Sequence, residues 1–135
     1  MLIRFAAAAT VASVAIALGS LVIPLLLIFN PEGFGVVTRL WCLLPVVWGV
    51  WAMLTPRGWM PGRLPQWGAI LGLLLGVVAL LMFNLPARAF YFHLPVQARI
   101  GGVLLASGFY YLLWLLVRKV CQAMTQTPQP ASSAP

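Results

Sequence analysis

The chain has 135 residues, of which 63% are hydrophobic and only 7% charged, and its formal net charge is +7. A soluble domain of this length has too few charged side chains to cover so much apolar surface, whereas a lipid bilayer solvates that surface directly. Most basic residues stand at the ends of apolar runs, as membrane anchors and topology signals do, which argues against a nucleic-acid-binding face. The composition therefore predicts an all-α protein whose first partner is the lipid bilayer.

The first apolar run covers residues 5–29 and follows the positive start Met1–Arg4. A secretory signal peptide has an apolar region of only about 7–15 residues before its cleavage site. This run is longer, so we predict a retained transmembrane helix, with cleavage near Gly19 and Ser20 as the alternative.

Three further apolar runs follow, and they are residues 36–54, 67–85 and 100–117. Each has close to the 20 or so residues that a helix needs to cross a hydrocarbon core of about 30 Å. We predict a turn at Asn30–Gly33, a bent interfacial loop at 55–66, and a re-entrant or surface-lying segment at 87–99, which is too short to span. Residues 1–121 form one transmembrane domain, and the Pro- and Ser-rich tail 122–135 is predicted to be disordered.

Four spans in one antiparallel bundle place both termini and the middle loop on the same side of the membrane. That side carries five basic residues and the other carries three, which favours cytoplasmic termini in a cell inner membrane. The sequence around Phe29-Asn30-Pro31 is echoed around Phe83-Asn84-Leu85-Pro86, which is consistent with two tandem helical hairpins, although apolar sequence produces such matches easily.

Two stripes of small residues recur at every fourth position, so each lies on one face of its helix. The stripes are Gly68, Gly72 and Gly76 in the third run, and Ala9, Ser13 and Ala17 in the first. In lipid, small residues let two helix backbones approach closely. We therefore predict that both stripes are helix-packing faces, and that the two meet one another.

The predicted spans lack the acidic residues of proton-coupled transport and the clustered His and Cys residues of metal or haem sites. In length and span number the chain is similar to small four-helix multidrug exporters, but their coupling depends on a carboxylate inside the first helix, and Glu32, the single acid here, lies in a predicted turn. His93 is the only histidine, and Cys42 and Cys121 show no metal-ligand spacing. The sequence thus predicts no catalytic residues, no metal and no cofactor.

One interfacial cluster has functional potential. Arg88, Tyr91, His93 and Arg99 gather cationic and hydrogen-bonding groups that suit an anionic lipid headgroup or a quinone ring, although an anchoring segment has the same composition. Likewise, Trp41, Trp48 and Trp51 lie at helical spacing, and this pattern is typical either of packing or of an aromatic surface for a pigment, quinone or lipid.

These features predict a non-catalytic membrane protein that acts through helix–helix contacts, as an accessory or assembly subunit with other membrane subunits or with itself. Replacing Gly72 with leucine should then break assembly. The alternative is a small oligomeric transporter or channel whose path is lined by four polar residues, Thr10, Ser13, Ser20 and Asn84. A third interpretation is an enzyme acting on lipid at residues 90–99.

Overall fold

The computed structural model describes residues 1–26, 31–59, 62–90 and 93–126, and all regular structure in this part of the chain is helical. The elements are α1 (Leu2–Leu26), α2 (Pro31–Met53), the 3-10 helix η1 (Arg57–Trp59), α3 (Leu64–Gly76), the π-helix η2 (Val77–Met82), α4 (Leu85–Phe90) and α5 (Val96–Gln126). In the described part, three segments are long and apolar enough to cross a membrane: Leu2–Leu21, Leu64–Met82 and Val96–Gln126. The predicted all-α class with long apolar helices is thus confirmed.

The second predicted span, 36–54, lies within α2 up to Met53, and the apolar stretch found there among the described residues is the shorter Trp41–Met53. The helix begins at Pro31, so the predicted turn was wrong at Pro31–Gly33. The physical reason is that the fixed φ of proline and its missing N–H suit the first position of a helix. Asn30 lies outside the described residues.

The third predicted span, 67–85, corresponds to α3 and the π-helix η2, which ends at Met82, and Asn84 follows with a φ of +47°. The segment predicted to lie at the surface is divided between the short helix α4 and the start of α5. With 31 residues, α5 is about 46 Å long, which exceeds the hydrocarbon core of about 30 Å. It continues to Gln126, into the stretch predicted to be disordered from residue 122, and residues 127–135 lie outside the described part.

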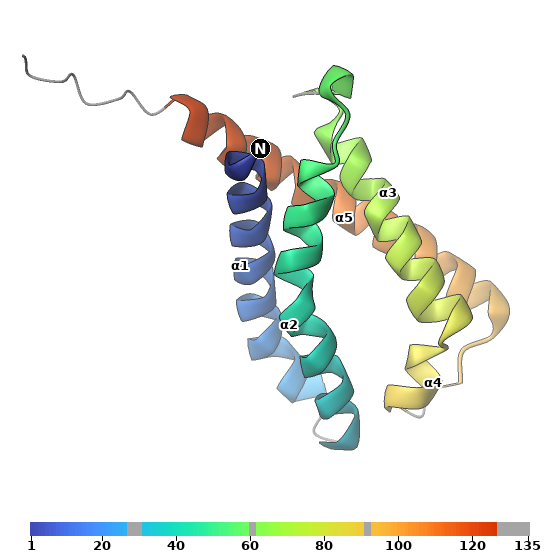
Figure 1. The fold of residues 1–135 in the computed structure, drawn as a ribbon. Coiled ribbons are helices and arrows are strands. Elements are labelled where there is room, and N and C mark those ends of the chain that lie inside the picture. The colour runs from blue at the N-terminus through green and yellow to red at the C-terminus, as the bar shows by residue number, and fades with distance from the viewer. Residues whose placement is uncertain (27–30, 60–61, 91–92, 127–135) are drawn as a thin grey trace, which may run out of the picture.

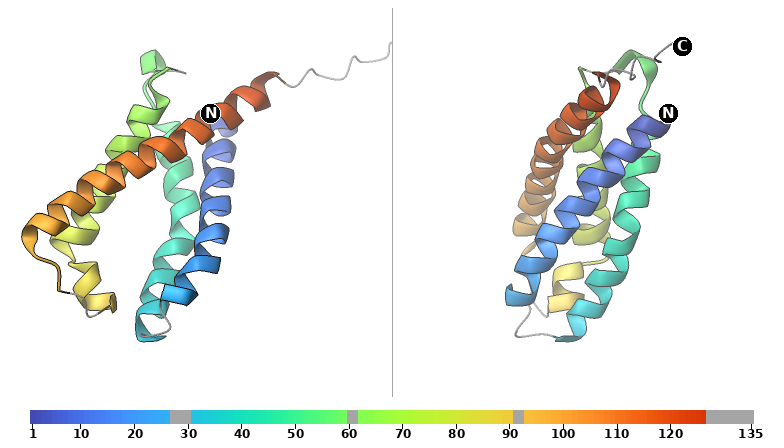
Figure 2. Two further views of the ribbon diagram at one scale, coloured as in Figure 1. Left: turned by 180° about the vertical axis from the view of Figure 1, so that it is seen from behind. Right: turned by 90° about the vertical axis from the view of Figure 1, so that its left-hand side faces the viewer.

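The four longer helices form two antiparallel pairs, α1 with α2 and α3 with α5 (Figure 1). Gly49 brings α2 close to α1, because the ring of Phe5 lies where a side chain at Gly49 would begin. Figure 2 shows α5 running obliquely across the molecule, and its C-terminal half packs against α1. The N-terminus of α1, the loop after α2 and the C-terminal end of α5 lie at the same end of the molecule (Figures 1 and 2).

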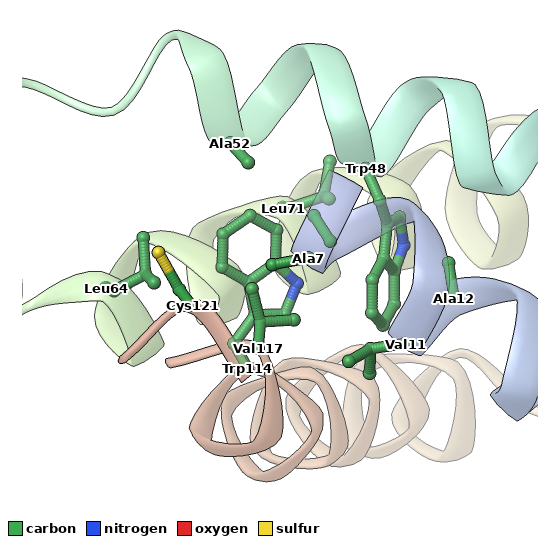
Figure 3. Packing of buried hydrophobic residues seen from close by; sticks show 11 residues of the cluster. Ala7, Val11, Ala12, Trp48, Ala52, Leu64, Leu71, Trp114, Val117 and Cys121 are labelled. Carbon is green, nitrogen blue, oxygen red and sulfur yellow. The ribbon is translucent and has the colours of Figure 1, made fainter. Parts of the chain in front are cut away.

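The buried core lies where the two pairs meet, towards this end of the molecule. Its buried residues are Ala7, Ala8, Val11, Ala12, Trp48, Ala52, Leu64, Leu71, Trp114, Val117 and Cys121. Figure 3 shows most of them converging from α1, α2, α3 and α5. Trp114 is completely buried and its ring centroid lies 5.9 Å from that of Trp48. Small side chains on α1 and large ones on α5 therefore fill the space between the pairs together.

Candidate functional site

The glycine stripe of α3 packs against α5 of the same chain. Gly68, Gly72 and Gly76 are buried. A side chain at Gly68 would overlap Trp114, and a Cβ at Gly72 would lie 2.6 Å from Cβ of Tyr110. At Gly76 the nearest atom is Cα of Val103, at 3.3 Å from an added Cβ.

The contacts continue on the same line along both helices. Moving four residues forward on α3, from Gly68 to Gly72, moves the contact four residues back on α5, from Trp114 to Tyr110. Beyond the glycine stripe, the small residue is on α5 and the large one on η2. There Gly102 faces Leu80, whose Cδ1 would lie 2.9 Å from a Cβ added at Gly102. Large side chains on one helix thus fit the small positions of the other, which allows close antiparallel packing.

The small face of α1 lies elsewhere. Ser13 and Ala17 are exposed and Ala9 is half-buried, whereas α1 uses Ala7, Ala8, Val11 and Ala12 to contact the core. The two small stripes therefore do not meet, because α5 occupies the glycine face. The side chains of Trp114 and Tyr110 fill the space beside Gly68 and Gly72.

Hydroxyl groups on the exposed face of α1 are satisfied within the helix. Thr10 donates to the carbonyl of Ala6 at 2.8 Å, and Ser13 donates to that of Ala9 at the same distance. Ser20 donates to Ala17 at 2.7 Å. Beside this face, a groove of about 340 Å³ lies between α1 and α2 and is lined by Ser13, Ile16, Ser20, Trp41, Cys42 and Pro45.

Ser107 makes a hydrogen bond between helices, since its hydroxyl on α5 donates to the carbonyl of Ala69 on α3 at 3.0 Å. We expect Ser107→Ala to lower the free energy of unfolding by about 0.6 kcal/mol, and by no more than roughly 1.7 kcal/mol, the range for such bonds in membrane proteins. Unfolding in mixed micelles measures this. The control is Ser13→Ala, whose hydroxyl binds only its own helix and should change stability less; an equal loss in both would contradict the prediction.

Two indoles join α2 to α3. Trp51 donates its ring N–H to the carbonyl of Trp67, and Trp67 donates to the carbonyl of Trp51, both at 2.9 Å. Their rings are stacked with centroids 4.8 Å apart and planes 19° from parallel. Trp59 meets the ring of Trp67 edge-on at 5.7 Å, and Arg63 lies 6.0 Å from the centre of the Trp59 ring. These reciprocal hydrogen bonds connect the α1–α2 pair to the α3–α5 pair.

The predicted headgroup cluster is described only in part. Arg99 is half-buried and its Nε donates to the carbonyl of Leu94 at 3.0 Å, so this cation helps to hold the chain that enters α5. His93, which precedes Leu94 in the chain, is exposed. Arg88 lies in α4, but its side chain is outside the described part, and Tyr91 is outside it altogether. The cluster as a whole therefore stays a prediction.

Groups that bind metals or act as nucleophiles do not gather in the described part of the chain. No three His, Cys, Asp or Glu residues come together there. Cys42 is exposed, Cys121 is buried, and both are free thiols. What the arrangement offers instead is apolar surface, two grooves and a small number of neutral hydrogen-bonding groups.

Sequence reasoning missed the partners of the glycine stripe. Trp114 and Tyr110 received no role in the sequence analysis, although both belong to a line at four-residue spacing with Ala106 and Gly102. This line has the same period as the glycine stripe, and the match of the two periods was the available signal. The reciprocal bonds of Trp51 and Trp67 had no such signal, because they depend on how two helices meet.

The comparisons with known proteins identify no relative. No family model matches the sequence, and neither a curated protein nor a solved structure is significantly similar to the chain.

Proposed function

We propose that the chain is a non-catalytic, multi-pass protein of the cell inner membrane that acts through helix–helix contacts, as an accessory or assembly subunit of a membrane complex. The observation that carries the proposal is the exposed small face of α1. Ser13 and Ala17 are exposed in the part of the chain that the structure describes, and Ser13 lines the groove between α1 and α2. Such a face lets the backbone of another helix approach closely, as the glycines of α3 do for α5.

The proposed topology has four spans, formed by α1, α2, α3 with η2, and α5, with both termini in the cytoplasm. The antiparallel pairing of α1 with α2 and of α3 with α5 supports it (Figures 1 and 2). The end that holds the N-terminus also carries Arg63 in the loop and Arg118 and Lys119 near the C-terminal end of α5. The excess of cationic side chains there favours the cytoplasmic side.

The experiment is purification in mild detergent followed by mass spectrometry of co-purified proteins. We expect Ser13→Leu to reduce partner recovery at least fivefold, because leucine keeps the two backbones apart, while the monomer stays folded. Ser13 is the better position for this test than Gly72, because Gly72 packs inside the chain and Gly72→Leu would disturb the fold itself. Gly108→Leu is the matched control, since Gly108 on α5 is exposed and has open space where a Cβ would be added.

Equal recovery of partners from the wild type and Ser13→Leu would refute the proposed face. Recovery of the chain alone, as a defined oligomer, would instead favour the alternative of a small channel or transporter. In that case Thr10, Ser13 and Ser20, whose side chains share the exposed side of α1, would line a path between copies.

A further inference from the structure

A second crevice, of about 260 Å³, lies on the side of α1 that faces α5. Residues of three helices form its walls, and four of them are aromatic: Trp41 and Trp48 of α2, and Phe109 and Tyr110 of α5. The wall on α1 is made of small or aliphatic residues, including Ala15 and Gly19. No charged side chain lines the crevice among the described residues, so a charged ligand finds no partner there.

Two hydrogen-bond donors of this crevice, on Trp48 and Tyr110, lack an acceptor among the described residues. Trp48 is only 3% exposed, and its indole N–H has no hydrogen-bond partner among the residues that the structure describes. The Tyr110 ring packs against the Trp48 ring, with centroids 5.2 Å apart and planes 58° from parallel. The hydroxyl hydrogen of Tyr110 has no acceptor among the described residues. An apolar site with an unused donor is complementary to an apolar ligand that carries an acceptor.

We propose that this crevice binds the ring of a membrane quinone, with a ring carbonyl accepting a hydrogen bond from Tyr110 and the apolar tail lying in the lipid. A quinone ring is flat, uncharged and rich in carbonyl acceptors, which matches the aromatic walls and the free donor. The volume is below the roughly 300–1,000 Å³ of drug-sized pockets, so it suits a single ring with its tail outside. The Trp48 ring, whose centroid lies 5.2 Å from that of Tyr110, forms the aromatic wall beside this donor.

The depth of the crevice argues against a phospholipid chain as the occupant. Tyr110 lies at the middle of α5, about 12 Å along the helix axis from the basic residue Arg118 that marks the membrane boundary. Ester carbonyls of a phospholipid stay at that boundary, so only methylene groups would reach Tyr110 and its donor would stay unpaired. A quinone brings an acceptor to this depth. The inference is independent of the proposed assembly role, because the exposed face of α1 is not needed for it.

The test uses the full chain in phosphatidylcholine nanodiscs that contain no quinone. Decylubiquinone is titrated in, and quenching of tryptophan fluorescence is followed, since Trp41 and Trp48 line the site. We expect saturable quenching by the wild type, and an apparent affinity at least fivefold weaker for Tyr110→Phe, which keeps the ring and loses the donor. Tyr111→Phe is the matched control, because Tyr111 is exposed and lines neither groove.

Ala15→Leu is the second variant, because it fills the crevice from α1 and should abolish the saturable component even if Tyr110→Phe were to fold poorly. Circular dichroism checks the helix content of each variant. The proposal is overturned if wild-type quenching does not saturate, if Tyr110→Phe and Tyr111→Phe behave alike, or if Ala15→Leu binds normally. Displacement of the quinone by decylbenzene at equal concentration would also overturn it, since that result identifies a site for any apolar chain.

Discussion

Gly68→Ala is expected to lower the free energy of unfolding by about 2–3 kcal/mol, within the range for overpacking a filled interior. The added methyl group would overlap the first side-chain atoms of Trp114, which are fixed to the backbone of α5. Trp114 is completely buried and so cannot turn aside. The helices must therefore move apart, and every contact along their interface is weakened.

Alanine substitutions at the three glycines of α3 should destabilise the protein to different degrees. An added Cβ meets Tyr110 at 2.6 Å at Gly72 and Val103 at 3.3 Å at Gly76, while Gly108 has no neighbour within 4 Å. We expect the loss of stability to fall in the order Gly68, Gly72, Gly76. Gly108→Ala is the control and should be neutral or stabilising by up to about 1 kcal/mol, because alanine favours the helix over glycine. Unfolding by increasing SDS in mixed micelles measures the series, and equal losses at Gly68 and Gly108 would contradict the interface.

Trp67→Phe is expected to cost about 1–2 kcal/mol of unfolding free energy. It removes the donor to the carbonyl of Trp51, which lies in the last turn of α2, where carbonyls have no helical donor of their own. Trp51→Phe should cost a similar amount, since it removes the reciprocal bond to Trp67. Both variants retain an aromatic ring, so that most of the stacking is kept and the loss reports on the hydrogen bonds.

A double-mutant cycle tests whether the two indoles act as one unit. We expect a coupling of about 0.5–1.5 kcal/mol between Trp51→Phe and Trp67→Phe, because each bond holds the ring that makes the other. Trp59→Phe is the control: Trp59 touches the same ring edge-on but makes no ring hydrogen bond to it. Additive losses from the pair, or an equal loss from Trp59→Phe, would show that the reciprocal bonds contribute little.

The sequence predicted the helical class and the position of the long apolar segments from local properties. Uninterrupted apolar runs of about 20 residues are enough to identify helices that can cross a membrane, because lipid requires each span to satisfy its own backbone. Helix ends were less predictable. Pro31 was interpreted as part of a turn but begins α2, because the same dihedral angle suits both structures.

The period of the glycine stripe likewise identified a face that must pack closely, before any partner was known. The tertiary structure decided which helix covers it. Gly68 could have faced a small residue of α1 or a large residue of α5. The four-residue spacing of the glycines does not distinguish these two arrangements, because both place one face of α3 against another helix. The available volume decides, since Trp114 fills the space that glycine leaves.

By itself, then, the sequence determined that the chain is helical and apolar, and it predicted two close-packing faces. Only the tertiary structure assigned these faces, one to the interior and one to the outside, and only it brought Trp48 beside Tyr110 to form a crevice. The physical reason is that burial in lipid is encoded residue by residue, whereas the pairing of helices depends on how side chains distant in the sequence share a volume.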